Sequence, residues 1–354
     1  MASRLTENGA HMAHCARMLD DLTFLRVINA SPDDDGPRLL YADYLDEKGD
    51  PASAAQAEFV RVQCALNAAG PGTGDITSLR QRERALLTEH WRTWLRPACQ
   101  ALAEPLPNPS RPSAQGSRYE LKWISGEERD IHYVEQSGTG ELPYFRSAQF
   151  RRGFLAHAAL AYKASRGERH VALLWDRAPI DGLTLFGFAP HHLATTLAAI
   201  EGGERIRSLE LGFSDDGSVT LIAMTAGLGA MRELVLKGIQ GRSDVAHVLA
   251  RSTTLEALQI LILDTCTVDE EGIARLCRAP FARALVRLEL INCGVTNSAA
   301  IRLTREFPTD GRLKHVDLTG NPLSAAATQA LQHRFGAVLY SHFGKREWPT
   351  RYFL

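Results

Sequence analysis

A short leucine signature that returns six times between residues 180 and 321 constrains this chain more than any other feature. The central apolar residues of the six copies are Leu183, Leu209, Leu234, Leu261, Leu288 and Val316, at steps of 26, 25, 27, 27 and 28 residues. A period of about 20 to 50 residues indicates stacked supersecondary units, because one such unit cannot bury its apolar face alone. The sequence therefore predicts a repeat architecture with one continuous core.

The signature continues into a defined turn in its last three copies. These copies read Leu263-Asp-Thr-Cys266, Leu290-Ile-Asn-Cys293 and Leu318-Thr-Gly-Asn321. The spacing L-x-x-L-x-L-x-x-N/C resembles the leucine-rich repeat. This resemblance implies an α/β solenoid of strand–helix units, similar to ribonuclease inhibitor, over residues 150–340. Cys266, Cys293 and Asn321 would then be buried at the turn and would bridge adjacent loops.

The segments between the signatures are predicted to be helical. They are Leu193–Ile200, Val219–Thr225, Asp244–Arg251, Asp269–Leu276, Ser298–Glu306 and Ala325–Arg334. Thr267 and Glu270 have the spacing of a capping box, and Thr296, Ser298 and Ser324 are candidate N-caps. We expect Phe154–Tyr162 and Ala337–Tyr340 to be strands that cap the two ends of the stack, since terminal repeats have an open edge.

Residues 18–103 are predicted to form a small all-α domain of four helices. Pro37 suits the first turn of a helix, where its missing N–H has no partner to lose. The cluster Lys48-Gly49-Asp50-Pro51 interrupts the pattern and ends that helix. The third helix is centred on Phe59 and the fourth on Trp91, each with apolar neighbours at steps of three and four.

This region also resembles a known family, the bacterial repeat-companion domain. The resemblance is carried by Phe24-Leu-Arg-Val-Ile28, Pro37-Arg-Leu-Leu-Tyr-Ala-Asp-Tyr-Leu-Asp-Glu47, Gly49-Asp-Pro51 and Ala57-Glu-Phe-Val-Arg-Val-Gln63. Tyr44 stands where the family usually has Trp. The family accompanies leucine-rich and other repeats in planctomycetes and myxobacteria, so the resemblance implies this domain order and transfers no chemistry.

Charged residues of the helical domain have two interpretations. Asp33, Asp34 and Asp35 could hold a cation, but they lack the EF-hand spacing, and helix capping with a solvated turn is the simpler interpretation. A second set of charged residues is expected to form ion pairs between helices rather than a catalytic site: Arg38, Asp43, Glu58 and Arg61.

The remaining segments are assigned by composition. Residues 104–149 contain four prolines within eight positions, which predicts a linker. Two segments of alternating apolar and polar residues follow, Tyr119–Ile124 and Asp130–Val134. They predict a β-hairpin. Residues 1–17 are interpreted as a disordered N-terminus or residues added for expression. Residues 341–354 are interpreted as a C-terminal cap or tail.

Bulk composition narrows the class of protein. Forty Lys and Arg residues balance 41 Asp and Glu residues, at a pI near 6.9, which argues against nucleic-acid binding. The six cysteines are scattered without a C-x-x-C pair, so we expect neither a disulfide framework nor a zinc site, and a reducing compartment fits. No apolar run is long enough for a membrane span, and the N-terminus lacks a signal-peptide core. A cytoplasmic protein that is monomeric on its own is expected.

The residues that flank the core leucines are predicted to line the concave side of the sheet. They suggest an apolar patch formed by Val235, Ile260, Ile262 and Ile291. Charged residues are expected to surround this patch as a mainly acidic rim: Glu210, Glu233, Asp264, Glu289 and Asp317, with Lys237 and Arg287 as the basic exceptions. An apolar centre inside a polar rim is typical of protein-binding surfaces, and an acidic rim would favour a partner with a basic one.

The sequence contains none of the common catalytic motifs. We find no G-x-S-x-G, H-E-x-x-H or G-x-x-x-x-G-K-S/T pattern, and no residue set that implies a metal or cofactor. The leading prediction is a non-enzymatic scaffold that binds another protein on the concave face. The alternative is a regulator, inhibitor or proteolytic substrate of a partner enzyme, which would use Arg287 or the linker Ala103–Ser117.

Overall fold

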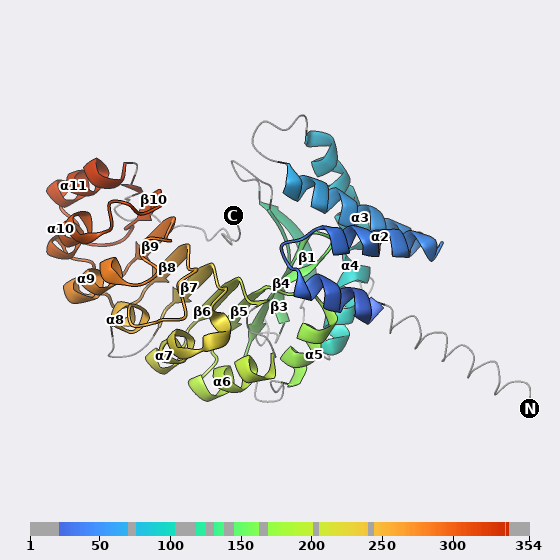
Figure 1. Cartoon of the computed structure of the whole chain (residues 1–354), viewed down its shortest axis with the longest axis horizontal. Helices are drawn as coiled ribbons and strands as arrows, with labels where there is room; N and C mark the ends of the chain where they lie inside the picture. The colour runs from blue at the N-terminus through green and yellow to red at the C-terminus, as the bar shows by residue number, and fades with distance from the viewer. Residues whose placement is uncertain are drawn as a thin grey trace, which may run out of the picture.

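The computed structural model describes residues 21–69, 76–102, 118–124, 131–137, 145–162, 169–200, 205–239, 244–336 and 338–339. Within these ranges the strands form one sheet of eleven, in the order β1 to β11 along the chain. The sheet curves into an arc, with helices α5 to α11 on its outer side and a helical module at its N-terminal end (Figure 1). The N-terminal tail, the linker Ala103–Ser117 and residues 340–354 lie outside the described residues.

The helical module contains the four helices that the sequence predicts. They are residues 21–30, α2 (Gly36–Glu47), α3 (Pro51–Ala68) and α4 (Thr77–Ala101). Pro37 lies in the first turn of α2, and Asp50 caps α3 by accepting a hydrogen bond from Ser53 N at 2.9 Å. In the described part of the chain, no helix is both long and apolar enough to cross a membrane.

Ion pairs link these helices, as expected. Arg61 on α3 lies 2.7 Å from Asp43 and 2.7 Å from Asp46 on α2. Glu58 pairs with Arg82 of α4 at 2.5 Å. All three pairs are substantially exposed, so solvent screens them and they contribute little to stability. Arg38 does not join them, because it is buried and turns toward the sheet.

The sheet begins with an antiparallel unit. Strands β1 (Arg118–Ile124), β2 (Ile131–Ser137) and β3 (Phe145–Arg151) pair in series, and the β1–β2 hairpin confirms the prediction for this region. Strand β4 (Phe154–Ala161) pairs antiparallel with β3 and parallel with β5. The expectation that Phe154–Tyr162 closes the first edge is therefore wrong, because three further strands extend the sheet beyond it.

From β4 onward the chain alternates strand and helix. The strands are β5 (Gly182–Phe186), β6 (Ser208–Gly212), β7 (Glu233–Lys237), β8 (Ile260–Asp264), β9 (Arg287–Ile291), β10 (His315–Asp317) and β11 (Val338–Leu339). All of them pair in parallel with the strand before, and the central apolar residues of the six signatures face one another in register. The predicted period is thus the spacing of parallel strands in an α/β strand–helix repeat fold.

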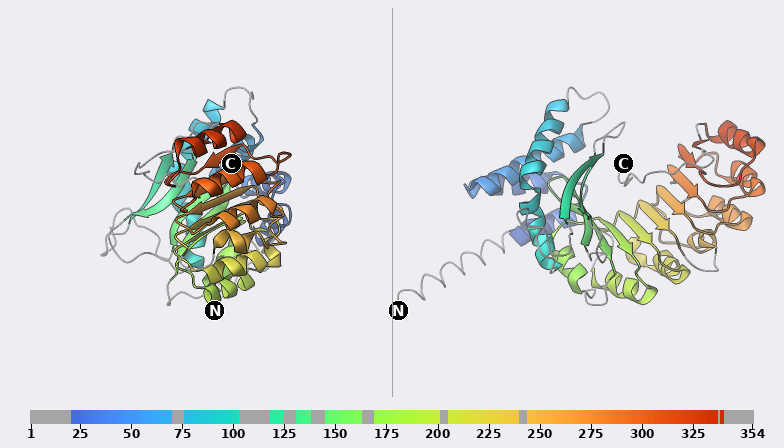
Figure 2. Two further views of the ribbon diagram at one scale, coloured as in Figure 1. Left: turned by 90° about the vertical axis from the view of Figure 1, so that its left-hand side faces the viewer. Right: turned by 180° about the vertical axis from the view of Figure 1, so that it is seen from behind.

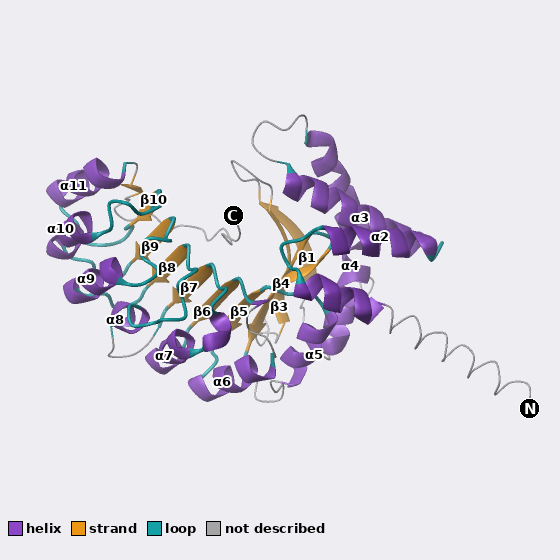
Figure 3. Cartoon of the chain, in the orientation of Figure 1, coloured by secondary structure: helices purple, strands orange, loops and turns teal. Residues whose placement is uncertain are grey.

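The helices of the repeats cover the outer side of the sheet (Figure 3). They are α5 (Arg169–Arg177), α6 (Pro190–Ala199), α7 (Asp216–Met224), α8 (Val245–Leu249), α9 (Glu270–Arg278), α10 (Asn297–Glu306) and α11 (Ala325–Phe335). Thr296 and Ser324 are N-caps, as predicted. The predicted capping box is wrong: Asp269, not Thr267, caps α9 by accepting from Gly272 N.

Each of the strands β5 to β10 is followed by a residue with a left-handed backbone conformation, that is, a positive φ. These residues are Gly187, Phe213, Gly238, Thr265, Asn292 and Gly320, with φ between +51° and +79°. The turn lets the backbone N–H donate to a carbonyl of the next repeat, as Gly238 N does to Asp264 O at 2.8 Å and Thr265 N to Ile291 O at 2.8 Å. The hydrogen-bond ladder therefore continues past the end of each strand.

Buried polar side chains then bridge the turns, as predicted. The thiol of Cys266 donates to Leu236 O at 3.5 Å, and that of Cys293 donates to Leu263 O at 3.3 Å. Burial raises the pKa of Cys266 to about 11, which keeps this group a neutral donor. Asn321 bridges its turn to the preceding one by accepting from Cys293 N at 3.0 Å.

The helical module is joined to the sheet at the β3–β4 turn. Gly153, with φ +86°, donates its N–H to Gln63 Oε1 at 2.6 Å and leaves no space for a side chain against Val60 of α3. Phe59 and Trp91 belong to the same core cluster as the repeat leucines. The module thus caps the repeat stack rather than folding around a wholly separate core, and Figure 2 shows it at the N-terminal end of the arc.

Candidate functional site

Two features of the sheet are candidates for function: its inner face and a cavity at one edge. The inner face carries the side chains that alternate with the core leucines, because successive side chains of a strand point to opposite faces. The parallel register aligns its middle column: Thr184, Glu210, Val235, Ile262, Glu289 and Asp317.

The four residues of the predicted apolar patch do lie together, but they differ in exposure. Val235 and Ile262 are direct neighbours in the register and are only 2% and 7% exposed. Ile260 and Ile291 are half-buried and lie on either side of them. A partner could therefore contact Ile260 and Ile291 first, whereas Val235 and Ile262 mainly support the surface.

The predicted acidic rim is not an exposed rim. The five carboxylate residues are 0–6% exposed: Glu210, Glu233, Asp264, Glu289 and Asp317. The expectation of accessible acidic groups is therefore wrong. The reason is pairing within the face, since Lys237 Nζ lies 2.6 Å from Glu210 and Arg287 pairs with Glu289.

Among the described residues, the accessible charged groups of the inner face are instead the basic Lys237 and Arg287, with the imidazole of His315 beside them. The side chains of Lys237, Arg287 and His315 are 27%, 19% and 31% exposed. His315 Nε2 lies 3.4 Å from Glu289, so all three groups cover buried carboxylates. A partner would meet cationic atoms over a buried acidic layer.

Burial also changes the acidity of this layer. Desolvation raises the pKa of Glu210 and of Asp264 above their ordinary values. The pKa of Glu233 is raised to about 7, mainly by burial and further by the neighbouring Glu210. A carboxyl group raised in this way binds its proton more tightly in the folded than in the unfolded state.

The Glu233→Gln variant should therefore be more stable than the wild-type protein, but only at higher pH. In the wild-type protein, the stabilisation that protonated Glu233 provides is lost as the pH rises from about 4.5 to about 7. Glutamine mimics the protonated acid, so we expect equal stability near pH 4.5 and a gain of up to about 3 kcal/mol at pH 8. Urea unfolding at both pH values measures the difference, with the exposed Glu256→Gln as control. A gain of equal size at both pH values would contradict the assignment.

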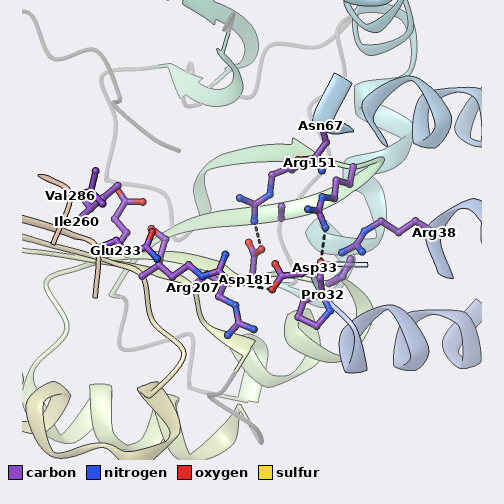
Figure 4. Close-up of a pocket in the computed structure, with 16 residues that line it drawn as sticks. Pro32, Asp33, Arg38, Asn67, Arg151, Asp181, Arg207, Glu233, Ile260 and Val286 are labelled. Atoms are coloured by element: carbon purple, nitrogen blue, oxygen red, sulfur yellow. Dashed lines mark hydrogen bonds and ion pairs between the residues drawn. The ribbon is translucent and has the colours of Figure 1, made fainter. Parts of the chain in front are cut away.

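The second feature is a cavity of about 440 Å³ between the helical module and the N-terminal ends of the strands. Its lining comes from three parts of the chain: the loop before α2 with nearby residues of α2 and α3, the β3–β4 turn with its flanking strand residues, and the residues at or just before the starts of strands β5 to β9 (Figure 4). Five of the lining residues are arginines: Arg38, Arg151, Arg152, Arg207 and Arg232.

Ion pairs to nearby carboxylates hold several of these arginines. Arg151 pairs with the half-buried Asp181, and Arg232 lies 3.2 Å from Asp33. Arg152 donates to Pro32 O at 2.7 Å and lies 3.3 Å from Asp35. Asp33 and Asp35 thus bind arginines of the sheet, whereas Asp34 accepts from Gly36 N in the predicted helix-start role.

The sequence patterns do not single out this cavity. One signal for it exists: Asp181, Arg207 and Arg232 each stand two positions before the central leucine of successive repeats. In the stacked repeats these three residues form a charged column along one edge of the sheet. The other arginines come from distant segments, and only the docking of the helical module brings them to this column.

Two groups of potential metal ligands occur among the described residues. One consists of Asp244, His247 and Asp269, and the other of Glu289, His315 and Asp317, each with ligand atoms within 4.8 Å of one another. In each group, at least one carboxylate already binds an N–H group of the protein. Asp244 accepts from Asp269 N at 2.5 Å, and Arg287 pairs with Glu289. We assign no metal to either group.

Comparisons with known proteins do not identify a family. No protein-family model matches the chain, and no curated protein matches it. A crystal structure of a protein from Bacteroides fragilis is similar over 65% of this chain and 93% of that chain, at 11% identity and a TM-score of 0.29. A TM-score this low supports no argument about the fold, so the function has to be inferred from the residues of this chain.

Proposed function

We propose that this protein is a non-enzymatic scaffold that binds a partner protein on the inner face of a leucine-rich-repeat solenoid. The repeat-companion helical domain would be its N-terminal cap. The observation that carries the proposal is the inner face itself: half-buried Ile260 and Ile291 beside the basic Lys237 and Arg287. Apolar anchors with a polar surround are the usual composition of a protein interface.

The proposed partner presents acidic groups around an apolar contact. A partner with a basic rim fits this face poorly, because the acidic groups are buried under Lys237, Arg287 and His315. Complementary charge chiefly steers association and selects the partner, while the central apolar contacts supply most of the binding energy.

Replacing both Ile260 and Ile291 by Glu should abolish capture of the partner. Each side chain is half-buried, so the change places charge at the contact while leaving the core leucines untouched. The matched control is Ile301→Glu, because Ile301 is also half-buried but lies on the outer helix α10. Proteins retained by immobilised wild-type protein and by the control, but lost from the double variant, are the expected partners.

The variant set distinguishes the proposal from general loss of folding. Ile262 is unsuitable for such a test, since it is only 7% exposed and a buried charge there would destabilise the protein. If the double variant keeps its circular dichroism spectrum and still captures the same proteins as the wild type, the inner face is not the binding surface.

A further inference from the structure

The cavity beside the helical module has more positive than negative groups in its lining. Its five arginines exceed its three carboxylates, which are Asp33, Asp181 and Glu233, by two. One of the compensating pairs is weak, because Arg232 and Asp33 are 51% and 61% exposed and solvent screens them. Without this outer pair the lining still holds four arginines and two carboxylates, so the inner part of the cavity is more strongly positive than its exposed rim.

A buried donor in the cavity lining is also left without a partner. Arg38 is 6% exposed, and one of its terminal nitrogens donates to Asp34 O at 2.6 Å, but its Nε has no partner. Leaving a buried donor unpaired costs about 1–3 kcal/mol. The side chain of Arg38 therefore favours a ligand that accepts hydrogen bonds.

The arginines are held in position before any ligand binds. Arg151 and Arg207 approach the space around Asp181 from the sheet, while Arg38 points toward it from α2 (Figure 4). Asp181 is surrounded by positive charge, since Arg151, Arg38, Arg152 and Arg207 all act on it. Preorganised guanidinium groups match the oxygens of phosphate, which they can bind with paired hydrogen bonds.

We propose that this cavity binds a phosphate monoester. Its charge of about −1.5 to −2 at pH 7 is opposite in sign to this arginine-rich lining, whose five arginines still outnumber the three lining carboxylates and Asp35, the partner of Arg152. A volume near 440 Å³ lies in the range of small-molecule sites, about 300–1,000 Å³. The ester is carried either by a small molecule or by a phosphorylated side chain. This site adjoins the proposed protein-binding face at Ile260, which lines the cavity, but its arginines are not part of that face and the proposal does not depend on protein binding there.

The consequence is a coupling between ligand and domain docking. Arg38 and Asp33 come from the helical module, whereas Arg151, Arg207 and Arg232 come from the sheet. A phosphate bound between them would contact both parts, and it would stabilise the folded protein because the site exists only where the two parts are packed together.

Isothermal titration calorimetry on the full chain, with three probes, tests the proposal. The probes are inorganic phosphate, glycerol 3-phosphate and a phosphoserine peptide, with glycerol and the unphosphorylated peptide as blanks. We expect one site, no binding of the blanks, and tighter binding of whichever ester is the natural source. Arg207→Gln and Arg232→Gln, both at positions that are not fully buried, should each weaken binding by about tenfold or more.

Two further variants distinguish a change in the binding site from a loss of folding. Asp181→Asn removes the carboxylate that competes with the ligand for Arg151, so it should bind the phosphate ester several-fold more tightly than the wild type. Arg283→Gln, which breaks an exposed pair with Asp310 and is not a lining residue of the cavity, should leave affinity unchanged. The proposal is overturned if no probe binds, if Arg283→Gln weakens binding as much as Arg207→Gln does, or if Asp181→Asn fails to strengthen it.

Discussion

Gly153→Ala is expected to destabilise the protein by about 2–5 kcal/mol, as the sum of two effects. A Cβ atom at Gly153 would lie 2.6 Å from the backbone Cα of Val60 and 2.3 Å from its Cγ2. No side-chain rotation relieves a contact with backbone, so the helical module would have to move. Overpacking of this kind costs about 1–3 kcal/mol, and the φ of +86° adds about 1–2 kcal/mol for a residue with a side chain.

Gly187→Ala is the matched control for this prediction. Gly187 also has a positive φ, +69°, but a Cβ there meets nothing within 4 Å. The control should lose only about 1–2 kcal/mol, from the backbone conformation alone. Urea unfolding of both variants measures the difference. Equal losses would show that close contact between Gly153 and Val60 does not hold the module against the sheet.

Asn321→Ala should have the next largest effect, a loss of about 3 kcal/mol or more. Its side chain is 4% exposed and bonds only to backbone. The Oδ1 atom accepts from Cys293 N at 3.0 Å and Val295 N at 2.9 Å, and Nδ2 donates to Leu290 O at 2.6 Å and Leu318 O at 2.9 Å. Alanine would leave these buried groups unpaired, at about 1–3 kcal/mol for each group that water cannot reach.

Asn297→Ala is the control for Asn321. Asn297 makes a single exposed bond of the same kind, from Ser324 N to its Oδ1 at 2.7 Å, so its replacement should cost no more than about 1 kcal/mol. The two thermal unfolding midpoints should differ clearly. If Asn321→Ala is as stable as Asn297→Ala, the asparagine does not tie its repeat to the previous one.

The repeat could be predicted because each unit obeys the same local rule. Leu209, Leu234 and Leu261 have to align once the period is known, since parallel strands stack one period apart. Asn321 could be placed because its position in the turn is fixed relative to Leu318. The pattern predicts the wrong cap, Thr267, because three of the four residues at this helix start can accept a bond, and spacing alone does not choose Asp269.

The pairing and burial of the charged side chains on the inner face could not be predicted in the same way. Register places Glu210 and Lys237 on the same face of adjacent strands, but their ion pair depends on the side-chain conformation of the lysine, which has no sequence signature. The cavity is harder still. Its arginines lie on segments more than 100 residues apart, such as Arg38 and Arg151, and the packing of the helical module against the sheet sets their distance.

Methyl NMR with the partner captured by the wild-type chain tests most directly whether the inner face is the binding surface. Isoleucine methyl groups report from both sides of the sheet, with Ile260 and Ile291 on the inner face and Ile301 on the outer helix α10. We expect titration of the partner to shift or broaden the signals of Ile260 and Ile291 and to leave that of Ile301 in place. A change at Ile301 with Ile260 and Ile291 unaffected would contradict binding on the inner face.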